Sequence, residues 1–144
     1  MHDNDALLLK NQLCFSLYAA SRAVTRLYQP VLRKLGLTYP QYIVMLILWE
    51  KDHLSVSEIG ALAQLNSNTL TPLLKRLETQ GLIQRITSKQ DERQKTIVLT
   101  TGGLKLKQHC AAIPATLREQ RGVTVEKAKQ LKTLLDELLA DFDA

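Results

Sequence analysis

The stretch LTPLLKRLETQGLIQRITSKQDERQKTIVLT, Leu70 to Thr100, decides the fold. Its first part repeats leucine at helical spacing and ends at Gly81, which is typical of an amphipathic helix with a glycine stop. The segments LIQRIT and TIVLT then alternate apolar and polar residues with a period of two, and they enclose the wholly polar SKQDERQK. A helix followed directly by a β-hairpin with a basic tip predicts a winged helix.

The preceding stretch, LSVSEIGALAQL at 54–65, supplies a second short helix. Ser55 and Glu58 have the spacing of a capping box. One apolar face is formed by Ile59, Leu62 and Ala63. The short polar gap LNSNT separates this helix from the next one, so the pair is a helix-turn-helix candidate, although such pairs are also common as plain packing units.

Two further helices are predicted on the N-terminal side. From Ala6 to Leu35 the apolar positions recur at steps of four and three and Gly36 follows, which indicates one long amphipathic helix. The segment TYPQYIVMLILWE then opens with Thr38 as a predicted N-cap, with Gln41 at capping-box spacing. Because this segment is apolar nearly all round, we expect a buried central helix.

The last third of the chain, 101–144, is predicted to be helical again, with a kink or break at Pro114 and a cap at Thr124. The final helix carries an apolar stripe of Val125, Ala128, Leu131, Leu134, Leu135, Leu138 and Phe142. A stripe of this size is too large to leave in water, so it must meet the first helix, another subunit, or both.

The composition limits the function. A Leu-rich chain of 144 residues with few aromatic residues favours one compact, mostly helical unit. No apolar run is long enough to span a bilayer and the N-terminus lacks the pattern of a signal peptide, so we expect a cytoplasmic protein that does not enter membranes. No phosphate loop, metal-ligand spacing or paired nucleophile and base is present, which predicts no cofactor, no metal site and no enzyme activity.

The net charge of +5 is moderately basic, and the basic residues concentrate where a winged helix meets DNA. The span from Lys75 to Lys95 holds six Lys or Arg residues against three acidic ones. A helix-turn-helix places the N-terminal residues of its second helix at base edges. We therefore expect base contacts from Ser67, Asn68, Thr69, Thr71 and Pro72, and phosphate contacts from Lys75 and Arg76. The other interpretation of the basic hairpin is a merely solvated tip.

The wing residues Asp91, Arg93 and Lys95, followed by Leu99 and Thr100, resemble the wing signature of the MarR family of dimeric winged-helix regulators. The segments NQLCFSLYAASRAVTRLY, LGLTYPQYIVMLILWE and LTPLLKRLE are similar, more narrowly, to its organic-hydroperoxide-sensing (OhrR-like) subgroup. The likeness spans Asn11 to about Lys107. It implies one MarR-type domain, 1–144, with dimerisation helices in 1–36 and 101–144 and a winged-helix DNA-binding part in 37–100.

This resemblance implies a transcriptional repressor that binds double-stranded DNA as a homodimer at an inverted-repeat operator. In the family the residue matching Arg93 enters the minor groove at the wing tip, and the residue matching Asp91 helps to hold it. Lys89 and Lys95 complete the basic wing. Two such modules would read half-sites about one helical turn apart, roughly 34 to 36 Å.

The same resemblance implies a thiol sensor. The cysteine at the position of Cys14 reacts with organic hydroperoxides in the family, and tyrosines matching Tyr28 and Tyr39 hydrogen-bond to it. Cys14 and Tyr28 share one helix face, but fourteen residues at about 1.5 Å each separate them by roughly 21 Å. We therefore expect Tyr28 of the partner subunit to reach Cys14 across a two-fold axis. The alternative is that Cys14 is only a small packing residue.

The second cysteine, Cys110, leaves two alternatives open. It resolves oxidised Cys14 across the dimer, which requires Cα atoms within about 7 Å, or it is an ordinary thiol and a small cellular thiol caps the sulfenic acid. Two other functions also compete. One is a MarR-type regulator released by a small aromatic or phenolic ligand. The other is a thiol peroxidase, for which the sequence offers no second motif to recycle Cys14.

Overall fold

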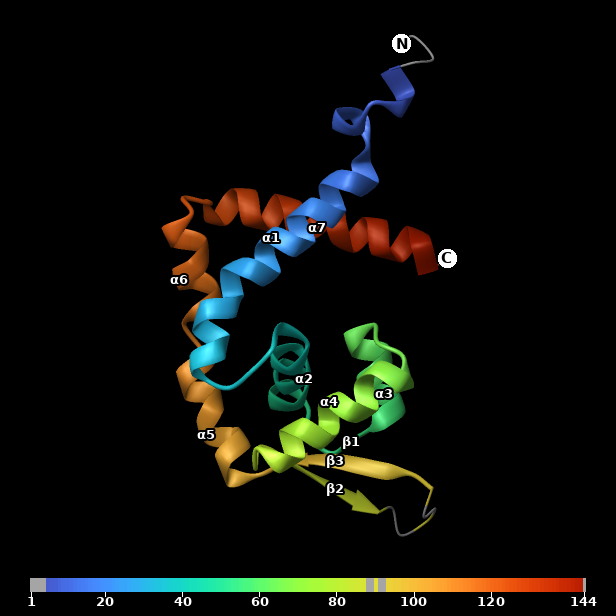
Figure 1. Ribbon diagram of the computed structural model, residues 1–144, viewed down its shortest axis with the longest axis vertical. Coiled ribbons are helices and arrows are strands. Elements are labelled where there is room, and N and C mark those ends of the chain that lie inside the picture. The colour runs from blue at the N-terminus through green and yellow to red at the C-terminus, as the bar shows by residue number, and fades with distance from the viewer. Residues whose placement is uncertain (1–4, 88–89, 91–92, 144) are drawn as a thin grey trace. The chain divides into compact units, whose positions relative to one another are not determined.

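A computed structural model describes residues 5–87, 90 and 93–143 and confirms the predicted fold class, mainly α with a small β wing (Figure 1). Two short 3-10 helices come first, η1 (Asp5–Leu7) and η2 (Leu9–Asn11). The helices are α1 (Leu13–Lys34), α2 (Tyr39–Glu50), α3 (Val56–Ala63), α4 (Ser67–Thr79), α5 (Thr101–Cys110), α6 (Ile113–Gln120) and α7 (Val125–Asp143). The strands are β1 (Leu54–Ser55), β2 (Ile83–Thr87) and β3 (Lys95–Leu99). The chain forms two compact units, Met1–His109 and Cys110–Ala144.

The first helix is shorter than the predicted 6–35, because α1 begins only at Leu13. Gln12, just before it, is extended, and the side-chain amide of Gln12 donates to Ala6 O at 2.6 Å and to Leu8 O at 3.1 Å. Asn11 Nδ2 likewise donates to Asp5 O at 2.7 Å. These amides bind carbonyls that a continuous helix would use, so the first turns close as separate 3-10 helices.

The central helix α2 is buried, as predicted. Thr38 and Gln41 form the full capping box, in which Gln41 N donates to Thr38 Oγ1 at 3.3 Å and Thr38 N donates to Gln41 Oε1 at 3.0 Å. Its buried apolar residues are Tyr42, Val44, Met45 and Leu48. Trp49 Nε1 donates to Gly103 O at 2.9 Å, which ties the end of α2 to α5.

The helix-turn-helix is present as α3 and α4, which lie side by side in Figure 1. The cap at Ser55 is confirmed, since its Oγ accepts from Glu58 N at 3.1 Å. The predicted apolar face of α3 is only partly right: Ile59 is fully buried, but Leu62 is 62% exposed. The second helix begins earlier than the predicted gap LNSNT allowed, at Ser67, because Asn66 caps it.

The wing is an antiparallel sheet in the order β1-β3-β2 (Figure 1). The predicted hairpin is β2 paired with β3, with Arg85 opposite Ile97. The third strand, β1, was not predicted from the sequence; it pairs Leu54 with Ile97 and Ser55 with Thr96. Because β3 is central, β2 is an edge strand. Gly81, at φ +78°, makes the predicted stop between α4 and β2.

The second unit contains α6 and α7. The predicted break lies at the start of α6, where Pro114 occupies the first turn and Ile113 and Leu117 are buried. Thr124 caps α7 as predicted, because its Oγ1 accepts from Lys127 N at 3.2 Å. Within one chain no described residue of α7 is buried. The exposed large apolar residues of α7 are Val125, Leu131, Leu134, Leu135, Leu139 and Phe142.

In the described part of the chain, no helix is both long and apolar enough to cross a membrane.

Candidate nucleic-acid interface and sensor thiol

The helix α4 presents a polar face to solvent. Its buried face is formed by Leu70, Leu73, Leu74 and Leu77. The residues predicted to contact DNA bases are all exposed: Ser67, Asn68, Thr69, Thr71 and Pro72. Thr69 N donates to the side chain of the cap Asn66 at 2.9 Å, which fixes the first turn of α4. The leucines therefore hold the helix in the domain while its polar N-terminal half remains free to meet a ligand.

The turn between α3 and α4 is tight. Gln64 ends α3 in the left-handed conformation, with φ +58°, which L-residues adopt at some conformational cost. Gly60 lies against this turn, and an added Cβ there would meet Leu65 O at 3.0 Å. A side chain at position 60 would therefore press against the backbone of this turn.

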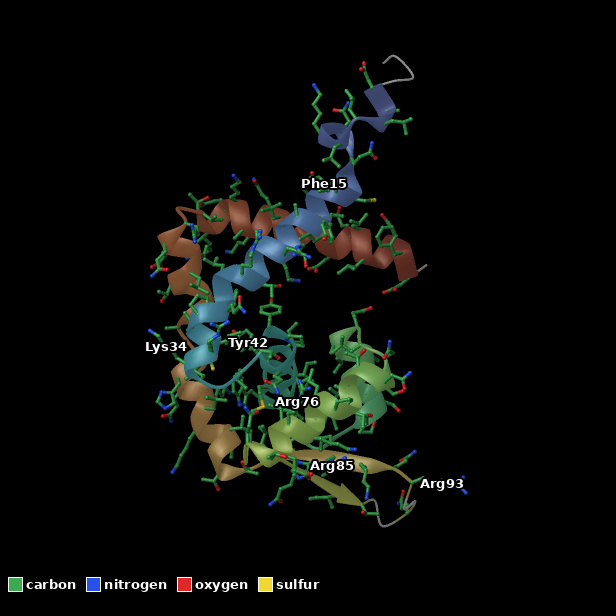
Figure 2. The ribbon with its side chains drawn as sticks, viewed as in Figure 1. Phe15, Lys34, Tyr42, Arg76, Arg85 and Arg93 are labelled. Carbon is green, nitrogen blue, oxygen red and sulfur yellow. The ribbon has the colours of Figure 1, made fainter. Side chains whose placement is uncertain are left out.

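The predicted phosphate-contacting residues lie one turn farther along α4. Lys75 and Arg76 are both exposed, and Figure 2 labels Arg76 on this helix. On the wing, Lys89 and Asp91 lie outside the described residues. Arg93 is exposed at the tip, where Figure 2 shows it at the far end of the hairpin. Lys95 Nζ donates to Thr87 Oγ1 at 2.7 Å across the two strands.

An ion pair that was not predicted from the sequence joins α4 to the wing. Glu78, in the last turn of α4, accepts three hydrogen bonds from Arg85 on β2. Hydrogen bonds from the Arg85 side chain and from its backbone N–H, together with the charges of Arg85 and Lys95, hold the pKa of Glu78 below its usual value. The carboxylate is therefore charged at neutral pH. The sequence does carry one signal that could have indicated this ion pair. Glu78 and Arg85 are seven residues apart and lie on opposite sides of the glycine stop at Gly81.

Two more hydrogen bonds attach the wing to the helical core. Asp52 Oδ1 accepts from the N–H of Leu99, the last residue of β3, at 2.9 Å. Thr100 Oγ1 donates to Gly81 O at 2.5 Å, which links the end of β3 to the turn before β2. The two hairpin strands are thus held at their base as well as by their own pairing.

The predicted sensor thiol, Cys14, lies in the second position of α1 and is exposed within one chain. Tyr28 belongs to the same uninterrupted helix, fourteen residues on, so about 21 Å of helix axis separates the two side chains. Within one chain the structure therefore does not bring Cys14 and Tyr28 together. Apolar side chains next to the thiol are also exposed, with Leu13 at 64% and Phe15 at 41%.

The structure does bring the two predicted tyrosines together. The rings of Tyr28 and Tyr39 are 5.1 Å apart in an edge-to-face arrangement, and Tyr42 lies 5.6 Å from Tyr28 and 6.0 Å from Tyr39. Burial raises the pKa of Tyr28 and of Tyr39, and the neighbouring Tyr39 raises that of Tyr28 further. Both phenols therefore keep their protons at neutral pH and can donate hydrogen bonds. Tyr42 was not among the predicted site residues.

A hollow of about 430 Å³ lies beside these tyrosines, at the junction of α1 and α2. It is lined by Thr25, Gln29, Arg33, Gly36, Leu37, Thr38, Tyr39 and Pro40. The lining combines apolar surface with one guanidinium group, and its size falls within the range of small-molecule sites.

The second thiol, Cys110, has a different environment. It is 3% exposed, and burial raises the pKa of its thiol. A buried thiol with a raised pKa is a poor nucleophile, so Cys14 is the better candidate for first attack on an oxidant. Among the described residues, no group of three His, Cys, Asp or Glu side chains is placed to hold a metal ion.

Known proteins are similar to this chain in both sequence and fold. Residues 26–110 match the family described as transcriptional regulator SarA/Rot. The organic hydroperoxide resistance transcriptional regulator of Bacillus subtilis strain 168 is 49% identical over 135 residues, which cover 94% of this chain and 92% of that protein. Reduced AbfR bound to DNA matches with a TM-score of 0.84 and 35% identity over 100% of both chains, and AbfR is a protein of Staphylococcus epidermidis.

A disulfide form of AbfR also matches, with a TM-score of 0.63 and 36% identity over 94% of this chain and 96% of that one. The family match covers more than half of the chain, and the Bacillus relative is similar over nearly the full length of both proteins. The chain therefore belongs to the MarR/SarA family of winged-helix transcriptional regulators.

Proposed function

We propose that the chain is a redox-sensing repressor that binds DNA as a homodimer and leaves its operator when an organic hydroperoxide oxidises Cys14. The observation that carries the sensing half is the exposed, free thiol of Cys14 in the first turn of α1. The similarity to the Bacillus hydroperoxide-resistance regulator supports the same signal. A DNA-bound sensor that depends on a reduced thiol belongs in the cytoplasm.

The domain organisation follows from this proposal. The whole chain, 1–144, is one MarR-type domain, in which 37–100 reads DNA and the helical parts 1–36 and 101–144 form the dimer. Apolar residues that are exposed on both α1 and α7 in a single chain support this division, because they would be covered in a dimer.

DNA binding uses the exposed face of α4 and the wing. The side chains from Ser67 to Pro72 read base edges in the major groove, while Lys75 and Arg76 bind phosphate. Arg93 at the wing tip enters the minor groove, with Asp91 holding it and with Lys89 and Lys95 adding charge. The two-fold axis then requires an inverted-repeat operator with half-sites roughly one helical turn apart.

Sensing is a two-electron reaction at Cys14. The Cys14 thiolate attacks one peroxide oxygen, the O–O bond breaks, and the alkoxide takes a proton to leave as an alcohol, while the sulfur becomes a sulfenic acid. Tyr28 and Tyr39 of the partner subunit donate hydrogen bonds to the thiolate, which their retained protons allow. Each thiol consumes one peroxide, so the protein acts as a sensor rather than as an enzyme.

Oxidation then changes the tyrosine contacts in the dimer interface. These tyrosines lie at the junction of α1 with α2, and α2 packs against both α3 and α4. A change at the tyrosines can therefore reach the DNA-reading helix through directly packed elements. Either Cys110 or a small cellular thiol condenses with the sulfenic acid and makes the change persistent.

The test is DNA binding by fluorescence anisotropy, on a duplex that the reduced protein selects from a randomised pool. One equivalent of cumene hydroperoxide should release the wild type, whereas the Cys14→Ser protein should bind and remain bound. The Cys110→Ser protein is the matched control and should still respond, because Cys14 is intact. Equal release of the Cys14→Ser protein would contradict the proposal.

A second function is favoured by the hollow beside Tyr39, whose size and single guanidinium suit a small aromatic acid or phenol. A regulator of that kind would be released by the ligand regardless of oxidation. The two functions separate in the Cys14→Ser protein: release by salicylate without oxidant supports the ligand-controlled regulator, and insensitivity to salicylate supports the redox sensor.

A further inference from the structure

We infer that Glu78 and Arg85 are positioning residues for DNA binding, which set the direction of the wing relative to the recognition helix α4 without contacting DNA themselves. This inference rests on the proposed DNA-binding function. It concerns a pair that lies between the two predicted contact surfaces, the polar face of α4 and the tip of the wing at Arg93. Figure 2 shows Arg85 on the hairpin and Arg93 at its far end.

The contacts between the two residues use both carboxylate oxygens of Glu78. Glu78 Oε2 accepts from the backbone N–H of Arg85 at 3.0 Å. Glu78 Oε1 accepts from Arg85 Nε at 3.2 Å and from Arg85 Nη2 at 3.1 Å. Three charge-assisted bonds from one residue fix both the position and the orientation of the pair.

The backbone bond matters because β2 is the edge strand of the sheet. The outward N–H of Arg85 therefore has no neighbouring strand to bind, and Glu78 takes the place of one. This contact attaches the middle of β2 to the last turn of α4, whereas the bonds at Gly81 and Asp52 hold only the base of the hairpin.

The contact between Glu78 and the middle of β2 limits how far the tip of the hairpin can move. Residues in a strand advance by about 3.3 Å each, and β2 continues for two residues beyond Arg85, to Thr87. A small rotation of β2 about its base would be magnified at Arg93. The protein must place Arg93 and the α4 face on one DNA duplex at the same time, which a loosely attached wing would do less often.

A competing role for Arg85 is direct binding to a phosphate. The two roles predict opposite effects of Glu78→Gln. If Arg85 binds phosphate, neutralising Glu78 frees a cation and removes a negative charge near DNA, so affinity should rise. If Glu78 positions the wing, the same change weakens the attachment and affinity should fall.

The experiment compares operator affinity of the wild type, Glu78→Gln, Arg93→Ala and the double variant, each as the full reduced chain on a duplex selected by the wild type from a randomised pool. Glu50→Gln is the control for charge, because Glu50 is an exposed glutamate at the end of a different helix, α2. Thermal unfolding of every variant is recorded in parallel.

We expect Glu78→Gln to weaken binding on the order of tenfold, a typical coupling between contacting residues, and Glu50→Gln to leave it unchanged or slightly tighter. Arg93→Ala should weaken the wild type clearly but should have little further effect in the Glu78→Gln protein, because the tip is no longer held in place. A general loss of structure would not produce this dependence.

Two results would overturn the inference: tighter binding by Glu78→Gln, or an Arg93→Ala effect that is the same size in both backgrounds. Failure of the wild type to select any duplex would instead overturn the proposed DNA-binding function, and the inference with it. The two failures are therefore distinguished by the wild-type measurement.

Discussion

Gly103 is the residue at which the structure tolerates a side chain least. A Cβ built there would lie 2.2 Å from Leu82 O and 3.2 Å from Leu99 Cδ2, so backbone rather than a flexible side chain blocks it. We predict that Gly103→Ala lowers the free energy of unfolding by about 1 to 3 kcal/mol, although alanine favours helices. Urea unfolding measures this loss.

The neighbouring Gly102 provides the control for that prediction. A Cβ at Gly102 would meet its nearest atom, Gly81 O, at 3.1 Å, so Gly102→Ala should lose much less stability. Equal stability of Gly103→Ala and the wild type would show that Leu82 and α5 are not packed as described.

Cys110 should make stability depend on pH in alkaline solution. Burial raises its pKa above the ordinary 9.0, so the thiol of the unfolded chain ionises first as the pH rises. The unfolded state then binds fewer protons than the folded state, and the free energy of unfolding falls. We predict this fall from about pH 8 to about pH 10, measured by urea unfolding.

The fall should be smaller in the Cys110→Ala protein, which lacks the group, while Cys14→Ser should retain it. If Cys110→Ala loses stability with pH as steeply as the wild type, Cys110 is not the buried titrating group.

Among the structural elements, α4 has a role in stability and a proposed role in DNA binding. Two substitutions of its cap, Asn66, should distinguish these roles. Asn66→Ala removes the acceptor of Thr69 N and should lower the free energy of unfolding by about 1 kcal/mol. Asn66→Asp keeps an acceptor at a helix N-terminus, so stability should be retained, but its charge faces the proposed DNA surface and should weaken binding. Thermal unfolding measures the change in stability, and fluorescence anisotropy measures the change in DNA affinity. If Asn66→Asp binds DNA as tightly as the wild type, this end of α4 lies away from DNA.

Elements with a strong local signal were predictable from the sequence. The capping box at Thr38 and Gln41, the leucine face of α4 and the stop at Gly81 each depend on residues close together in the chain, and all three are confirmed. The start of α1 was predicted wrongly, because the apolar spacing continues upstream through two 3-10 helices. There the deciding interactions are the amide bonds of Asn11 and Gln12.

Long-range contacts were not predictable. The strand β1 has only Leu54 and Ser55, and its pairing depends on β3, about forty residues later. The bond from Asp52 to Leu99 and the triple contact of Glu78 with Arg85 likewise need the folded arrangement of two elements. At the candidate site, periodicity placed the exposed face of α4 correctly, whereas the attachment of the wing could be recognised only in the structure.

In the whole molecule, the proposed sensor would need two chains, because α1 separates Cys14 from Tyr28 by about 21 Å. We predict that Tyr28→Phe slows oxidation of Cys14 by about tenfold to a hundredfold, the value of a hydrogen bond to a charged group. Mixing Tyr28→Phe chains with Cys14→Ser chains should restore fast oxidation in mixed dimers, since the intact tyrosine of one chain serves the intact thiol of the other. Stopped-flow oxidation rates before and after subunit exchange provide the measurement.

A mixture that reacts as slowly as Tyr28→Phe alone would show that the tyrosine acts within its own chain or not at all. Mixing each variant with itself controls for the exchange procedure.

Oxidation of Cys14 is measured directly by intact mass under non-reducing conditions after one equivalent of cumene hydroperoxide. We expect that the wild type gains one oxygen at Cys14 or forms a disulfide through it, that Cys110→Ser still gains the oxygen, and that Cys14→Ser remains unmodified. If the folded wild type keeps Cys14 unmodified, or if Cys14→Ser is oxidised to the same extent, Cys14 is not the sensor and the redox account is wrong.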